Sequence, residues 1–211
     1  MVKRIARRSI LAIPAVLFLV CQAFPARAAD DPVGFIKALG DKAVVIINDH
    51  SLSGDESQAK FVSLFNDSFD VAGIGRYVLG HYWDHATPQQ IDNYLAAFKE
   101  YIVATYSTRF TRYTGQSFRV IDSHDDSDNS MVSSEIAGGA DGQPTHIDWV
   151  VHKTPDGYRI EDVVLDKVSM MQAQRAEFTS VIVHADGSID GLIAALRQKT
   201  GKGAVQSGST G

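Results

Sequence analysis

The hydrophobic pattern of this chain changes its period once, near Gly115. Before Gly115, apolar residues recur every three or four positions, which is typical of helices that pack by one face. After it, apolar and polar residues alternate over short runs, which is typical of half-buried strands. Helices gathered in one part of a chain and strands in another favour an α+β domain.

Capping residues predict where the helices of the first half begin. Asp31 precedes Pro32, and Thr87 precedes Pro88 with Gln90 three positions on; both are strong helix starts. We expect a helix from Asp31, a second from about Asp55, a third over 71–79 that ends at Gly80, and a long fourth from Thr87 to about Tyr113. After the strands, Ser169 and Ser188 are placed to cap two more helices.

Four strands are predicted between Gly115 and Ser169, over 118–123, 131–137, 145–153 and 158–165. Turn-rich segments over 124–129 and 138–144, and the turn Pro155-Asp156-Gly157, connect them. Consecutive hairpins make an antiparallel meander. Strict alternation places Ile147, Trp149 and Val151 on one face of the third strand, and Tyr158, Ile160 and Val164 on one face of the fourth.

Residues 1–28 have the pattern of a cleavable secretory signal peptide. Four basic residues precede an almost uninterrupted apolar run over 10–24, and Ala26-Arg27-Ala28 is an A-x-A cleavage site. We therefore expect export to the periplasm, one domain over 29–201 and a flexible Gly/Ser-rich tail over 202–211. The alternative is a membrane anchor, but the apolar run is shorter than the ~20 residues that a membrane span needs.

Without the leader the chain has 15 basic and 25 acidic residues, a formal charge of −10. Nucleic-acid binding needs a dense basic face, so this charge argues against it. The one cysteine, Cys21, lies in the leader. Disulfides, thiol catalysis and cysteine-ligated metals are therefore not expected in the exported part.

Few residues indicate catalytic or metal chemistry, and we expect neither a cofactor nor a metal. His81 and His85 stand four apart, but helix breaks on both sides argue against a shared zinc ion. Asp148, Glu161 and Asp162 could supply an acid and a base on the strands. Solvent exposure or backbone capping explains such carboxylates more simply. Phosphate-binding loops and nucleophile elbows are absent from the sequence.

Ordered motifs over about 35–196 resemble the MlaC family, the periplasmic phospholipid-binding proteins also called toluene-tolerance auxiliary proteins. The motifs are Arg76-Tyr77-Val78-Leu79-Gly80-His81-Tyr82-Trp83, Thr87-Pro88-Gln89-Gln90, Tyr113-Thr114-Gly115, Gly157-Tyr158-Arg159-Ile160-Glu161-Asp162-Val163, Val168-Ser169-Met170-Met171, Arg175-Ala176-Glu177-Phe178 and Asp190-Gly191-Leu192-Ile193. The chain departs from the family at Asp166-Lys167, where Glu-Gly is usual, and at Gln174-Arg175, where Tyr-Arg is usual.

The resemblance implies an apolar cavity between the helical layers and the sheet, and a carrier that shuttles a phospholipid between two membrane complexes. Its partners would be an outer-membrane lipoprotein complex and the MCE-domain ring of an inner-membrane ABC transporter. Methionine adapts to irregular shapes and would suit variable acyl chains. The residues expected to contact the lipid are Phe98, Ile102, Phe110, Ile147, Trp149, Val151, Ile160, Val164, Met170, Met171 and Phe178.

Three alternatives stay open from the sequence. The departures from the family pattern make its hopanoid-associated branch, which would carry a polycyclic lipid, one of them. Cone-shaped α+β folds also include enzymes that act on hydrophobic small molecules, which would require an acid and a base in the cavity, such as Asp148 or Asp162 with a nearby Tyr or His. A structural protein with a filled core has the same hydrophobic pattern as a protein with a hollow one.

Overall fold

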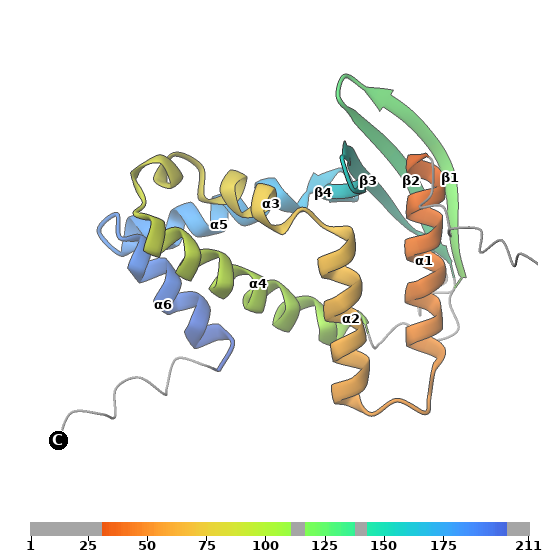
Figure 1. Ribbon diagram of the computed structural model, residues 1–211, viewed down its shortest axis with the longest axis horizontal. Helices are drawn as coiled ribbons and strands as arrows, with labels where there is room; N and C mark the ends of the chain where they lie inside the picture. The colour runs from red at the N-terminus through yellow and green to blue at the C-terminus, as the bar shows by residue number, and fades with distance from the viewer. Residues whose placement is uncertain (1–30, 111–116, 138–142, 202–211) are drawn as a thin grey trace, which may run out of the picture.

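The computed structural model describes residues 31–110, 117–137 and 143–201, without the side chains of 108–110. The predicted signal peptide, the tail over 202–211 and the end of the long helix near Tyr113 lie outside the described residues. Within them the chain is α+β, as predicted (Figure 1). Its elements are α1 (Pro32–Asn48), α2 (Gly54–Ser68), α3 (Val71–Leu79), the 3-10 helix η1 (Gly80–His85), α4 (Pro88–Phe110), β1 (Ser117–Asp126), β2 (Asn129–Ala137), β3 (Thr145–Thr154), β4 (Gly157–Leu165), β5 (Val168–Ser169), α5 (Met170–His184) and α6 (Ile189–Lys199).

Side-chain caps fix the helix starts, because the first turn of a helix leaves backbone N–H groups without partners. The predicted caps Asp31, Thr87, Ser169 and Ser188 are confirmed; each accepts a hydrogen bond from the backbone N–H three residues on, at 2.8–3.2 Å. Thr87 and Gln90 form the complete capping box. α2 begins slightly before the predicted residue, with Ser53 and Glu56 as a second capping box.

The sheet is one antiparallel meander in the order β1-β2-β3-β4-β5. The predicted turn-rich link over 124–129 is too long: β1 continues to Asp126, β2 begins at Asn129, and only Ser127 and Asp128 turn the chain. Strand pairing satisfies the backbone groups of this polar segment, which overrides its turn-like composition. The short β5 is an additional strand, joined to β4 by Asp166 and Lys167, both at positive φ.

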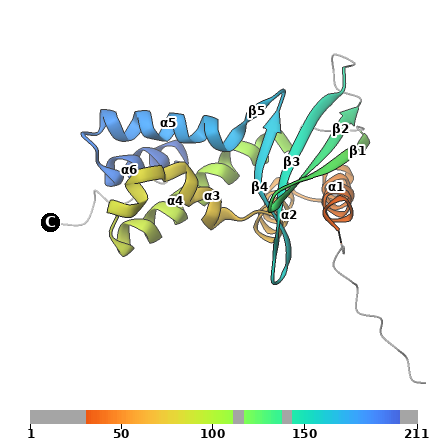
Figure 2. The same cartoon turned by 90° about the horizontal axis from the view of Figure 1, so that it is seen from above.

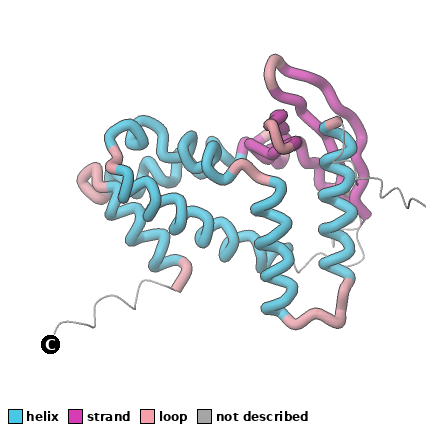
Figure 3. Tube along the Cα trace, in the orientation of Figure 1, coloured by secondary structure: helices cyan, strands magenta, loops and turns pink. Residues whose placement is uncertain are grey.

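Strands and helices separate along the molecule. α3 to α6 gather at one end, the sheet and α1 lie at the other, and α2 stands beside α1 (Figures 1 and 2). The tube view shows the same division of helix from strand (Figure 3). The chain therefore has two regions of packing rather than one continuous layer.

Each region has its own filled core. At the helical end the core is centred on the ring of Phe178, which is 1% exposed and packs against Tyr94, Phe98 and Tyr101. At the sheet end the core is formed by Ile36, Leu39, Val132, Val151 and Ile160.

Tyr94 ties α4 to α3 inside the helical core. Its hydroxyl donates to the carbonyl of Gly75 at 3.0 Å, and burial raises the pKa of Tyr94, so the group stays a neutral donor. Gly75 allows this approach, because a Cβ there would lie 2.6 Å from Leu95 Cδ2. Among the described residues, no single helix meets the length and hydropathy expected of a membrane span; α5 and α6 meet them only as a pair bent by 115°.

Candidate functional site

An apolar cavity of about 400 Å³ lies between the two cores. Helices α1 to α5 and the inner face of the sheet all contribute to its wall. This volume is in the range of pockets that hold small organic ligands. The wall consists of Leu39, Gly40, Ala43, Val44, Ile47, Asn48, Phe61, Leu64, Phe65, Phe69, Ile74, Val78, Phe98, Ile102, Tyr106, Ser117, Phe118, Ile136, Thr145, Ile147, Trp149, Glu161, Asp162, Val163, Leu165, Met170, Met171 and Gln174.

Six of the eleven residues predicted to contact lipid lie on this wall. They come from the long helix, the third strand and the start of α5: Phe98, Ile102, Ile147, Trp149, Met170 and Met171. The side chain of Phe110 lies outside the described residues. That the six bind lipid remains a prediction, because the cavity wall alone does not identify a ligand.

The other four predicted residues are not on the wall. Val151 and Ile160 are 1% and 0% exposed and fill the core at the sheet end, and Phe178 fills the helical core. Each is apolar and inward-facing as predicted, but a neighbouring element already covers it. Hydrophobic periodicity cannot separate such a residue from one beside a hollow.

The prediction that Val164 lines the cavity fails for a different reason, a β-bulge in β4. Val151 pairs with Ile160 and Val150 with Asp162, so Glu161 is an extra residue in β4. A bulge reverses the alternation beyond it. Val163 and Leu165 therefore line the cavity together with their β3 partners Trp149 and Ile147, and Val164 does not.

Trp149 is held in a fixed orientation in the sheet side of the wall. Its indole N–H donates to the Ser134 hydroxyl at 2.8 Å, and Ser134 in turn donates to the Ile147 carbonyl at 3.3 Å. Phe118 meets the indole edge-on, with ring centroids 6.5 Å apart. Ser134 is fully buried, so this hydrogen bond gives the indole N–H, the polar group of a large aromatic ring, a partner away from water.

Sequence periodicity missed the contribution of α1 and α2. Ala43, Val44 and Ile47 of α1, with Phe61 and Leu64 of α2, line the cavity. The signal was present in α1, where the run from Ala43 to Ile47 carries more apolar residues than one packed face requires; α2 has only one apolar face. Helical spacing alone assigned them to an ordinary core.

Of the three carboxylates considered for acid–base chemistry, Glu161 and Asp162 line the cavity, and Asp148 and Asp162 have structural hydrogen bonds. Asp148 does not line the cavity and accepts from the Ser133 hydroxyl at 2.6 Å. Asp162 is buried; it accepts from the Ser169 hydroxyl and from the backbone N–H groups of Val163 and Met171. It thereby fixes the start of α5 against β4.

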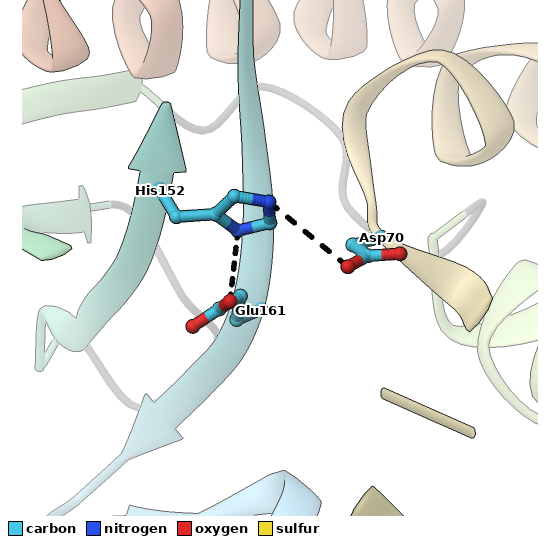
Figure 4. A group of neighbouring side chains, drawn as sticks. All are labelled: Asp70, His152 and Glu161. Carbon is cyan, nitrogen blue, oxygen red and sulfur yellow. Dashed lines mark ion pairs between the residues drawn. The ribbon is translucent and has the colours of Figure 1, made fainter. Parts of the chain in front are cut away.

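One cluster of titratable side chains adjoins the cavity: Asp70, His152 and Glu161 (Figure 4). His152 Nδ1 lies 3.0 Å from Glu161 Oε1, and Nε2 lies 4.0 Å from Asp70 Oδ2. The two ring nitrogens face different carboxylates, so the arrangement suits an imidazolium between two carboxylates better than a metal ion shared by all three. Nδ1 is buried, and its contact with Glu161 is close in distance but is not an aligned hydrogen bond.

Two comparisons with known proteins agree with this architecture. A solved structure, the phospholipid-binding protein from Ralstonia solanacearum in complex with a phospholipid, superimposes with a TM-score of 0.71. The two sequences are 20% identical, and the match covers 82% of this chain and 99% of the other, which establishes a shared fold. The family model described as MlaC protein matches residues 37–198, and the chain therefore belongs to the MlaC family.

Proposed function

We propose that this protein is a periplasmic lipid carrier that holds the acyl chains of a phospholipid in the cavity between its two cores. The cavity carries the proposal, because it is an apolar hollow between two clusters of buried side chains. Family membership and the phospholipid bound to the Ralstonia solanacearum protein support a role in binding rather than in catalysis.

Burial of acyl chains supplies the driving force. Each CH₂ group that moves from water into an apolar environment gains about 0.8 kcal/mol, so part of one chain provides micromolar affinity. Ordering the acyl chain in the cavity costs conformational entropy, which opposes this gain in free energy. Flexible Met170 and Met171 at the start of α5 suit chains of different length.

The predicted leader supports export to the space between two membranes, where a carrier with an apolar interior would be needed. We propose that it receives lipid from one membrane complex and delivers it to another, the partners being an outer-membrane lipoprotein complex and the MCE-domain ring of an ABC transporter. A polycyclic lipid of the hopanoid type is the alternative cargo.

Native mass spectrometry of the exported protein tests the proposal, and adjacent residues of β4 provide a matched pair of variants. Val163 lines the cavity and Val164 does not. We expect Val163→Trp to fill the hollow and to abolish lipid co-purification or restrict it to shorter chains. Val164→Trp adds the same bulk and should retain the wild-type lipid.

The mass of the bound species identifies the cargo as a phospholipid or a polycyclic lipid. Circular dichroism shows whether both variants remain folded. A lipid-free wild-type spectrum, together with no uptake from liposomes, would refute the carrier. Equal lipid content in the two tryptophan variants would show that the lipid is bound elsewhere.

A further inference from the structure

α2 is a lightly packed wall of the cavity. It provides Phe61, Leu64 and Phe65 to the wall, yet only Phe65 and Ser68 of its 15 residues are buried. In Figure 1 it stands between α1 and the helical end. An element with little buried surface is the one that opens at least cost.

The corner between α2 and α3 attaches this wall to the sheet. Phe69 lines the cavity and forms a parallel bridge with Ile160. The backbone N–H of Asp70 donates to the Ile160 carbonyl at 2.9 Å. Opening α2 away from β4 would strain these contacts first.

The cluster of Asp70, His152 and Glu161 spans the same corner. Asp70 accepts from the N–H of Gly73 with Oδ1 at 2.9 Å, which leaves Oδ2 facing His152. Glu161 accepts from the Asn129 amide with Oε2 at 3.1 Å, which leaves Oε1 facing the same ring. Each carboxylate thus has one oxygen engaged in the fold and one directed at the imidazole (Figure 4).

We propose that Asp70, His152 and Glu161 form a protonation-dependent latch that holds the α2–α3 corner against the sheet and controls the opening of the cavity. This inference rests on the proposed carrier function. His152 is a positioning residue, because it acts through the corner and does not line the cavity.

Protonation gives the direction of control. A protonated imidazole carries a positive charge that attracts both carboxylates, at 3.0 and 4.0 Å from its nitrogens, whereas the neutral ring carries no charge. The register neighbours of His152 in the sheet are Asn129 of β2 and Arg159 of β4; Arg159 donates to the Tyr158 carbonyl at 2.9 Å. The latch is therefore strongest when His152 is charged, and a higher pH weakens it because it favours the neutral ring.

Transfer of fluorescent phospholipid from loaded protein to acceptor liposomes, measured between about pH 5 and 8, tests the latch. We expect the wild-type release rate to rise about fivefold over this range, the ratio that corresponds to one partly exposed ion pair. His152→Gln should release at the high-pH rate throughout. Asp70→Asn keeps a cap for Gly73 and removes the charge, so it should behave in the same way.

His146→Gln is the matched control. His146, like His152, lies on β3 and faces a glutamate: its Nδ1 is 3.5 Å from Glu135 Oε1. Its side chain, however, is 57% exposed. This variant should keep the wild-type pH profile, which excludes a general effect of replacing a β3 histidine, whereas the flat profile of His152→Gln excludes an effect of pH on the liposomes alone. A release rate independent of pH in the wild type, or an unchanged pH profile in His152→Gln, would overturn the latch.

Hydrogen exchange separates failure of the latch from failure of the carrier. In lipid-free protein at low pH, the Asp70 amide should exchange about fivefold faster in His152→Gln than in the wild type. This readout needs no cargo. Equal exchange rates would overturn the latch even if lipid transfer is established, and faster exchange would support it even if no lipid is found.

Discussion

Replacing Phe178 with alanine tests whether the helical end is a filled core. Its ring lies with centroids 5.7 Å from Tyr101, 6.0 Å from Phe98 and 6.4 Å from Tyr94, and the residue is 1% exposed. Removing such a ring leaves a cavity that the neighbouring rings cannot close, at a cost of about 3–5 kcal/mol. For a domain of this size that corresponds to a fall in Tm of roughly 10 °C.

Urea denaturation followed by circular dichroism measures the change in the free energy of unfolding. Met171→Ala is the matched control on the same helix, because Met171 borders the existing hollow and its truncation enlarges a space already present. We expect Met171→Ala to cost about 1 kcal/mol and to weaken lipid retention. If both variants lost the same stability, the distinction between filled core and cavity wall would be wrong.

Three further substitutions have defined outcomes in the same denaturation assay. Gly80→Ala should destabilise by about 1–3 kcal/mol, since Gly80 has φ of 61° and its Cβ would lie 2.9 Å from the Arg175 guanidinium; a neutral result would contradict this contact. Lys167→Gly should stabilise by about 0.5–1 kcal/mol, because Lys167 holds φ of 68° in the β4–β5 turn; a lower Tm would refute that explanation. Ser134→Ala should cost about 1–3 kcal/mol by leaving the Trp149 indole N–H without its partner, and the tryptophan emission should shift; unchanged emission would show that the indole keeps its orientation without Ser134.

The sequence predicted those parts of the fold that local chemistry decides. Asp31, Thr87, Ser169 and Ser188 were recognisable as caps because a cap depends only on residues within one helical turn. The Pro155-Asp156-Gly157 hairpin was predictable for the same reason. The division into helices and strands followed from the change of period at Gly115.

The cavity wall was predictable only in part, because it depends on contacts distant in sequence. Phe98 and Phe178 have the same apolar character, but only Phe98 reaches the hollow. Whether a residue faces packed neighbours or a void depends on elements that close over it from elsewhere in the chain. The pairing of His152 with Asp70, 82 positions earlier in the sequence, was beyond local analysis for the same reason.

The bulge at Glu161 connects the cavity to the proposed latch. Without this extra residue, strict alternation from Ile160 would turn Val164 inward and leave Val163 and Leu165 facing away from the hollow. The same residue provides the carboxylate that faces His152 beside the corner held by Ile160. One irregularity in β4 therefore sets which side chains form the sheet side of the wall and where the α2–α3 corner is fastened to it. Shape and control of the cavity are thus coupled through a single strand.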